Sequence, residues 1–260
     1  MDQPVTSSTL WELVEQAAAR WPDAPMLVSR QGDGCTFAQY RERAEVMAAG
    51  LADLGVGEGD VVSWILPTWV DTVVLAAALA RLGAVQNPII GIYRDREVGI
   101  CCEQTGVPLL IHPGEFGNYD FGGLADRVAA RTNGGLTPFV LGPASSPRGS
   151  GHARAGTARS GGGALADLHL RHHRRSEGAR HTDHTVGSFP AAMSARLDVQ
   201  HGDRYALVFP FPHIGGIGLL YMALQTGCTH LLDEAVDPVE TIRFLSEHGC
   251  THRSPACPST

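Results

Sequence analysis

Residues 36–66 read TFAQYRERAEVMAAGLADLGVGEGDVVSWIL and contain the pattern of one helix followed by one strand. Thr36 and Gln39 form a capping box, in which each side chain can satisfy a backbone N–H group at the start of a helix. Apolar side chains then recur every three or four residues, and Gly55 stands where a left-handed residue ends a helix. The continuous apolar run 61–66 is typical of a strand covered on both faces. The stretch predicts one helix–strand unit of an α/β fold.

Similar units lie on both sides of this stretch. Helices and short apolar strands alternate along the chain, which favours an α/β fold of layered sheets with crossover helices. Capping residues begin several helices, and a glycine ends several others. The expected helices are 9–20, 36–54, 70–82, 93–105, 217–227 and one that begins after Asp237, and the expected strands are 61–66, 84–90, 107–112, 206–211 and 228–233.

The chain divides into four expected parts. Residues 9–143 form a first α/β lobe, and residues 181–252 form a partial second α/β lobe with the same alternation. Between them, residues 144–180 are rich in Gly, Ser, Arg and His and lose the apolar periodicity, so we expect a disordered or frame-shifted segment. The tail 253–260 reads RSPACPST. It continues none of these elements and is expected to be aberrant.

Composition excludes several classes of protein. Of the 260 residues 43% are hydrophobic and 18% are charged, and the net charge of −7 argues against a nucleic-acid or anionic-membrane surface for the chain as a whole. No apolar run is long enough to cross a bilayer and the N-terminus lacks a signal-peptide pattern, so we expect a cytoplasmic protein. The cysteines form no C-x-x-C pair and are expected to be small buried thiols. They are Cys35, Cys101, Cys102, Cys228, Cys250 and Cys257.

The basic segment admits three ordinary interpretations. Residues 145–180 contain seven arginines and two carboxylates. Their net charge is therefore +5, although the net charge of the whole chain is −7. The segment can be a flexible linker, a nucleic-acid-binding arm or a histidine-rich metal tract. It contains no aromatic residue to stack on bases, and the histidines have no acidic or thiolate partners at set spacing. Those histidines are His169, His172, His173, His181 and His184.

Lysine is absent from the whole chain, although arginine occurs 20 times. Codon bias in a GC-rich gene accounts for missing surface lysines. The absence also excludes any reaction that needs a lysine ammonium to hold a transferring phosphate or to activate a carboxylate.

Two blocks of the sequence resemble one enzyme family. TFAQYRERAEVMAAGLADLGVGEGDVVSWILP followed by LGAVQNPI resembles the opening of adenylate-forming (AMP-binding) enzymes, which include acyl-CoA synthetases, luciferases and peptide-synthetase adenylation modules. FPFPHIGGIGLLYMALQTGCTHLL with DPVETIRFLSEHGCTH resembles a later block, in the same order. The resemblance covers most of 9–143 and 181–252. It implies the large N-terminal domain of these enzymes, and acyl-CoA synthetases or fatty-acid–CoA ligases fit best because FPHIGG resembles their acyl-pocket motif.

The resemblance fails at one loop. Between the two blocks the family has a loop similar to YTSGTT-x-x-PKG, whose N–H groups, hydroxyls and lysine hold the ATP phosphates. This chain has LHLRHHRRSEG at 168–178 instead. Codons can be chosen for 169–178 that encode TSGTTADPKG when they are read one base further. We therefore favour a frame-disrupted segment over a linker.

The resemblance also implies a set of site residues and cofactors. His213, Gly215 and Gly216 are expected to bind the acid, and Gly178, Arg180 and Thr182 flank the altered loop and are weak candidates for nucleotide contacts. The family uses ATP, Mg²⁺ and coenzyme A with a small carboxylic acid. We expect this chain to bind none of these cofactors, to have no catalytic or metal-binding residue, and to be an inactive remnant without the C-terminal lid domain.

A non-catalytic interaction protein with a basic exposed linker is the alternative. The sequence predicts neither the length of the acid nor the oligomeric state.

Overall fold

The structure is a computed structural model that describes residues 7, 9–106, 108–132, 135–142, 164–169, 177–234 and 237–252. For 164–169 and 177–178 the backbone alone is described.

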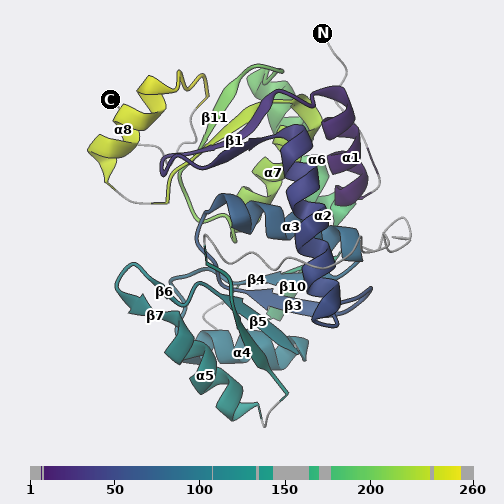
Figure 1. Cartoon of the computed structure of the whole chain (residues 1–260), viewed down its shortest axis with the longest axis vertical. Helices are drawn as coiled ribbons and strands as arrows, with labels where there is room; N and C mark the ends of the chain where they lie inside the picture. The colour runs from purple at the N-terminus through teal and green to yellow at the C-terminus, as the bar shows by residue number, and fades with distance from the viewer. Residues whose placement is uncertain are drawn as a thin grey trace.

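Two sheets form the framework of the molecule (Figure 1). Sheet A has the strand order β11-β12-β1-β2, in which β1 pairs with β12 and β12 with β11 in parallel, and β2 is antiparallel at one edge. Its parallel strands come from the two ends of the chain. The strands are β1 (Pro25–Ser29), β2 (Gly34–Thr36), β11 (Arg204–Leu207) and β12 (Thr229–Leu232).

Sheet B has six strands in the order β10-β9-β4-β3-β5-β8. All neighbours are parallel except β9 and β10. A separate two-stranded hairpin, β6 (Glu115–Phe116) and β7 (Tyr119–Asp120), follows β5. The strands of sheet B are β3 (Val61–Trp64), β4 (Val85–Pro88), β5 (Leu109–His112), β8 (Thr137–Val140), β9 (Ala164–His169) and β10 (Glu177–Thr182).

A layer of helices separates the two sheets, and the main core lies in it (Figure 1). This core joins Leu27 and Leu207 of sheet A to Val62 and Trp64 of sheet B through the helices. Helices α3 and α7 are apolar on all sides because both sheets and neighbouring helices cover them. The layer consists of α1 (Leu10–Arg20), α2 (Phe37–Asp53), α3 (Val70–Leu82), α6 (Asp183–Leu197) and α7 (Ile214–Thr226).

Three further helices cover the outer faces. Helices α4 (Asp95–Thr105) and α5 (Phe121–Arg131) pack on the outer face of sheet B. Helix α8 (Pro238–Glu247) packs on the outer face of sheet A, where Phe244 meets Leu231. The layered α/β fold predicted from the sequence is confirmed.

The local signals at helix ends mostly hold. Thr36 and Gln39 make both hydrogen bonds of the predicted capping box. Gly83 and Gly227 are left-handed and end α3 and α7 as expected. At the start of α1 the side chain of Thr9 accepts from the N–H of Glu12, and the carboxylate of Glu12 accepts a hydrogen bond from Ser7.

The expected strand 206–211 is shorter than predicted. Strand β11 ends at Leu207, and residues 208–211 leave sheet A toward sheet B. Pro210 and Pro212 have no N–H groups to pair with a neighbouring strand, which accounts for the early end.

The basic segment contains structure that the sequence analysis did not predict. Residues 164–169 and 177–182 form the antiparallel pair β9–β10 at the edge of sheet B, and β9 joins the sheet at Gln86↔Leu165. The expectation of a disordered or frame-shifted segment at 144–180 stays a prediction, and its described residues 164–169 and 177–180 lie in this strand pair. The sequence of β9, ALADLH, shows only part of the apolar–polar alternation of a strand. Backbone pairing with β4 stabilises β9 in the sheet. The expectations for 143–163, 170–176 and the tail 253–260 fall outside the described residues.

Sheet A draws strands from both expected lobes, and sheet B combines strands of the first lobe with the β9–β10 pair of the basic segment. Strands β1 and β2 lie in 9–143 but belong to sheet A with β11 and β12, and the β9–β10 pair belongs to sheet B. Among the described residues, the two expected lobes therefore do not form two separate sheets on either side of the basic segment.

Four of the cysteines are buried free thiols, as predicted: Cys35, Cys101, Cys102 and Cys228. Burial raises the pKa of Cys35 and Cys228 to about 12, so these thiols stay protonated and unreactive. No helix among the described parts of the chain has the length and apolar character needed to cross a membrane.

Candidate functional site

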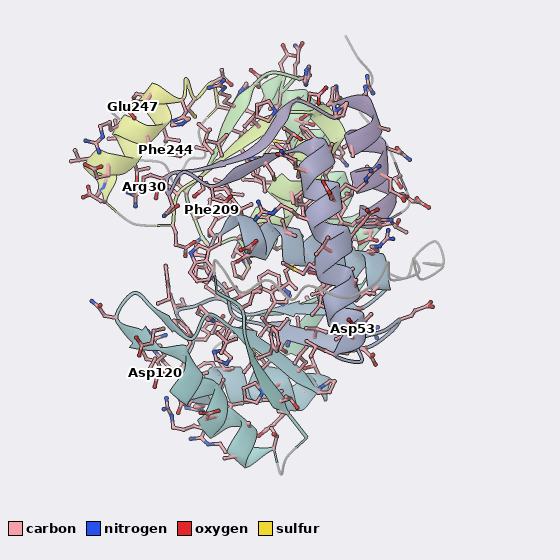
Figure 2. All side chains as sticks on the ribbon, viewed as in Figure 1. Arg30, Asp53, Asp120, Phe209, Phe244 and Glu247 are labelled. Carbon is pink, nitrogen blue, oxygen red and sulfur yellow. The ribbon has the colours of Figure 1, made fainter. Side chains whose placement is uncertain are left out.

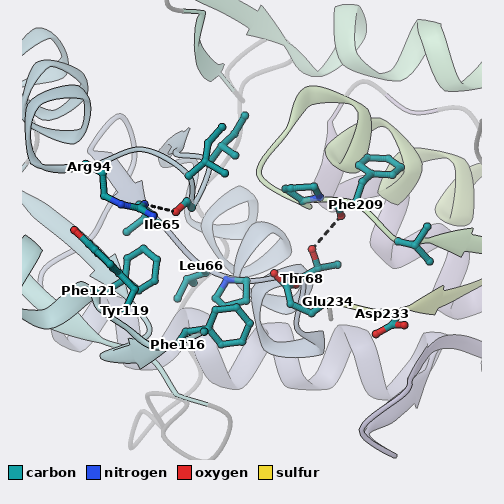
Figure 3. Close-up of a pocket in the computed structure, with 17 residues that line it drawn as sticks. Ile65, Leu66, Thr68, Arg94, Phe116, Tyr119, Phe121, Phe209, Asp233 and Glu234 are labelled. Atoms are coloured by element: carbon teal, nitrogen blue, oxygen red, sulfur yellow. Dashed lines mark hydrogen bonds between the residues drawn. The ribbon is translucent and has the colours of Figure 1, made fainter. Parts of the chain in front are cut away.

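A cavity of about 300 Å³ lies where the carboxyl ends of strands from both sheets meet (Figure 3). Segments 65–68 and 90–94 follow β3 and β4 of sheet B, and segments 208–210 and 233–234 follow β11 and β12 of sheet A. The β6–β7 hairpin closes one side. The carboxyl ends of parallel strands are the usual ligand sites of open α/β sheets. The fold thus brings four segments that are far apart in sequence to one candidate site.

Aromatic rings form the wall on the side of sheet B. Phe116 meets Trp69 edge-to-face at 5.5 Å between ring centroids, and Tyr119 meets Phe121 in the same way at 4.9 Å. The hairpin that carries Phe116 and Tyr119 turns through Gly117 and Asn118, both at positive φ, as a tight hairpin turn requires. This wall offers apolar, shape-selective contacts to a ligand.

Arg94 places a positive charge at the mouth of the cavity, beside Tyr119 (Figure 3). Its guanidinium carbon lies 4.2 Å from the centroid of the Tyr119 ring, and its Nη1 donates to the carbonyls of Gly91 and Tyr93. Within the described residues it forms no ion pair, because the neighbouring Asp95 binds Arg127 instead. The exposed guanidinium keeps donors available for an anionic ligand.

The wall on the side of sheet A carries a carboxyl group. Glu234 accepts a hydrogen bond from the backbone N–H of Thr68. Burial, aided by the nearby charge of Asp233, raises the pKa of Glu234 to about 7. Asp233 itself is held by Nε of Arg30 at 2.7 Å and by Oγ1 of Thr241 at 2.6 Å. Arg94 and Glu234 lie on opposite sides of the cavity (Figure 3).

Phe209 connects the cavity to the predicted acid-binding residues, and it lies between the two sheet layers (Figure 2). His213 is the exposed N-cap of α7, and its Nδ1 accepts from the N–H of Gly215 at 3.0 Å. A Cβ on Gly215 would lie 3.5 Å from the Phe209 ring, and one on Gly216 would lie 2.5 Å from the carbonyl oxygen of Phe211. The three residues are thus together at the start of α7, behind the cavity wall.

The predicted nucleotide residues lie elsewhere, on β10. Gly178 pairs with Leu168 and Thr182 with Ala164, so the two stand at opposite ends of the strand. Arg180 is exposed between them. The structure does not bring these residues together at one point.

The comparisons with known proteins agree on one family. The family model for AMP-binding enzymes matches residues 14–134. The salicyl-AMP ligase / salicyl-S-ArCP synthetase of Mycobacterium tuberculosis is 30% identical over 127 residues, which are 47% of this chain and 22% of that protein. The long-chain-fatty-acid–CoA ligase of Salmonella typhimurium is 30% identical over 109 residues, 42% of this chain and 19% of that protein. Over residues 14–134 the chain is similar to the adenylate-forming (AMP-binding) enzymes.

Solved structures of adenylate-forming enzymes share the fold. A Mycobacterium tuberculosis fatty acyl CoA synthetase superposes with a TM-score of 0.80 at 21% identity, over 95% of this chain and 49% of that chain. The Mycobacterium smegmatis MbtA apo structure gives a TM-score of 0.83 at 21% identity, over 94% and 47%. The chain therefore spans about half the length of these solved relatives and about a fifth of the curated ones.

The residues described around the altered loop do not fit the ATP phosphates that adenylate-forming enzymes use. Alternate N–H groups of β10 point toward β9 in the antiparallel ladder, and the Thr182 hydroxyl accepts from the N–H of Thr185 in the cap of α6. A phosphate site needs N–H groups that converge on one anion, together with a cation. Residues 170–176 lie outside the described part of the chain.

The cavity residues Thr68, Arg94 and Glu234 were not predicted from the sequence. One local signal was available, since EFGNYDF at 115–121 combines a Gly-Asn hairpin turn with three aromatic residues. The remaining lining residues carry no motif that can be recognised from the sequence alone.

Proposed function

We propose that this chain is built as the acid-binding part of an ATP-dependent acyl-CoA synthetase, which forms acyl-CoA from a carboxylic acid, ATP and coenzyme A through an acyl-adenylate. We further propose that the chain holds the acid but does not activate it. The observation that supports this most is the cavity at the carboxyl ends of both sheets, walled by both of the sequence blocks that resemble the family.

The cavity suits the apolar body and the single charge of a carboxylic acid. Phe116, Tyr119, Phe121 and Phe209 supply the apolar walls, and the guanidinium of Arg94 suits the carboxylate. The carboxylate would avoid the opposite side, where Glu234 lies. A volume of about 300 Å³ is at the lower end for small-molecule sites, so short or medium-sized acids fit best.

The predicted residues His213, Gly215 and Gly216 support this site from behind. Gly215 leaves room for the ring of Phe209, and Gly216 allows α7 to begin against the backbone of Phe211. We propose that they set the depth of the acid site.

The chemistry of activation is where this chain departs from the family. Stabilising a transferring phosphate depends on positioned cations and N–H donors. The chain has no lysine, and 168–178 replace the phosphate loop of its relatives with LHLRHHRRSEG. We therefore propose no ATP-dependent turnover, and a frame change in the gene remains our explanation for the segment.

A turnover assay with the purified chain tests the second half of the proposal. ATP, Mg²⁺, coenzyme A and either octanoate or benzoate are supplied, and acyl-CoA and pyrophosphate are measured. We expect both products at background. Acyl-CoA formed by homogeneous protein at a rate of about one per second, ordinary for enzymes, would refute the proposed lack of activation.

Calorimetric titration with octanoate tests the first half, with Arg94→Gln as the variant. Loss of a charge-assisted hydrogen bond should weaken octanoate binding about tenfold. Arg96→Gln is the matched control, since Arg96 is also an exposed arginine at the start of α4 but does not line the cavity. No binding by the wild type, or equal effects of the two variants, would favour the alternative of a non-catalytic interaction protein.

A further inference from the structure

Thr68 lies where three segments of the chain meet beside the cavity. Its backbone N–H donates to the carboxylate of Glu234, its hydroxyl donates to the carbonyl of Phe209 at 3.1 Å, and the same oxygen accepts from the N–H of Phe211 at 3.0 Å. Figure 3 shows the hydroxyl pointing at the Phe209 carbonyl, with Glu234 next to it. The side chain is 3% exposed, so water does not compete for these bonds.

The two bonds of the hydroxyl clamp the backbone of 209–211 at two points. A threonine hydroxyl can donate one hydrogen bond and accept another at the same time. The hydroxyl of Thr68 makes both bonds to the backbone of 209–211. An isosteric valine would keep the shape but leave the Phe211 N–H without its partner. Phe211 is completely buried, so that loss leaves a buried donor unsatisfied.

The clamped segment controls both the cavity wall and the start of α7. Phe209 lines the cavity. The N–H of His213 donates to the carbonyl of Pro210 at 3.1 Å, and Gly216 packs on the backbone of Phe211. A shift of 209–211 would therefore move the Phe209 wall and the first turn of α7 together.

We propose that Thr68 is a positioning residue of the acid site, which fixes the Phe209 wall and the His213 end of α7 through the backbone of 209–211. This inference rests on the proposed acid-binding function and adds to it a residue from the segment that follows strand β3. Thr68 acts through the segment and needs no contact with the acid.

The test compares Thr68→Val, Thr68→Ser and Thr72→Val in the full chain. Thr72 is also fully buried in α3, but its hydroxyl donates to the carbonyl of Pro67 and not to the 209–211 segment. Two readouts are used: amide hydrogen exchange at Phe211, measured by NMR, and the affinity for octanoate.

Thr68→Val should speed exchange at Phe211 at least about tenfold and weaken octanoate binding at least about fivefold, since a buried N–H loses its acceptor. Thr68→Ser should restore both to within about twofold, because the hydroxyl returns. Thr72→Val should leave the exchange rate at Phe211 and the octanoate affinity close to the wild-type values, even if it lowers the stability of the fold. Equal effects of Thr68→Val and Thr72→Val on both readouts would overturn the positioning role.

The wild type provides a second test that does not depend on a variant that folds. Its Phe211 amide must exchange as slowly as the buried amides of α3, and rapid exchange there overturns the inference. If the wild type binds no octanoate, the proposed function fails. The exchange data still decide whether Thr68 fixes the segment.

Discussion

The cavity lies at the carboxyl ends of β3 and β4, whereas the β9–β10 pair extends sheet B beyond β4. At the cavity, side chains from both sheets hold one another: Thr68 binds 209–211, and Asp233 binds Arg30. The β9–β10 pair joins sheet B through β4, and β9 ends on the same side as the parallel β4. In our proposal the cavity side holds the acid, whereas the side that would hold phosphate has LHLRHHRRSEG and no lysine in its sequence.

The largest effect should come from filling the space at Gly216, on the cavity side. A Cβ there would lie 2.5 Å from the carbonyl oxygen and 2.6 Å from the Cα of Phe211. Backbone atoms cannot rotate away, so the start of α7 must shift. Gly216→Ala should lower the free energy of unfolding by about 3 kcal/mol, which urea unfolding at pH 7 can measure.

Gly215→Ala is the matched control for this substitution. Its Cβ would meet the exposed His213 side chain at 3.2 Å and the Phe209 ring at 3.5 Å, and the histidine can move by a few tenths of an ångström. Alanine also gains about 0.5–1 kcal/mol over glycine in a helix. Equal losses for the two variants would show that this end of α7 is loosely packed, unlike the cavity side as described.

Several elements could be predicted from sequence because their signals are local. The capping box at Thr36, the glycines that end α3 and α7, and Asp237 with Pro238 at the start of α8 each act within one turn of helix. The β9–β10 pair was missed because its stabilisation comes from pairing with β4, about 80 residues earlier in the chain. Local pattern carries no information about such a partner.

The second largest effect should be a pH dependence of stability that comes from His230, which lies between sheet A and α7. This side chain is 1% exposed, and its Nε2 donates to the carbonyl of Leu219 at 2.7 Å. Burial lowers the pKa of His230 to about 4, below the value of about 6.5 in an unfolded chain. As the pH falls below 6.5 the unfolded state takes up the proton first, so this contribution to stability is lost between about pH 6.5 and 4.

His230→Gln isolates that contribution, because glutamine keeps a hydrogen-bond donor but does not titrate. The difference in unfolding free energy between wild type and variant should shrink by about 2 kcal/mol from pH 7 to pH 5. Urea unfolding at the two values measures it, and His184→Gln, at an exposed histidine of α6, serves as the control. A difference that stays constant with pH would mean that His230 is accessible to protons in the fold.

The candidate site could be predicted only in part. FPHIGG identified the start of α7, which is one supporting layer of the cavity, because the motif is continuous in sequence. Thr68 and Glu234 are 166 residues apart and meet only in the fold. Neither residue has a distinctive neighbour, so their hydrogen bond and the raised pKa of Glu234 could not be foreseen.

The smallest of the three effects tests the hairpin side directly. Replacing residues 169–178 with TSGTTADPKG supplies glycines, hydroxyls and one lysine at the end of β9, where N–H groups and a cation can hold phosphate oxygens. Calorimetry should show ATP binding at least about tenfold tighter than to the native chain, a gain of about 1.4 kcal/mol, since one charge-assisted hydrogen bond contributes about this much.

The same replacement with glutamine in place of the lysine is the control and should lose most of the gain. Octanoate binding should stay unchanged in both, because no residue of the cavity wall is altered. If the repaired chain binds ATP no better than the native chain, the hairpin edge is not the phosphate side. The contrast between an acid-binding side that is kept and a phosphate-binding side that is lost would then have to be given up.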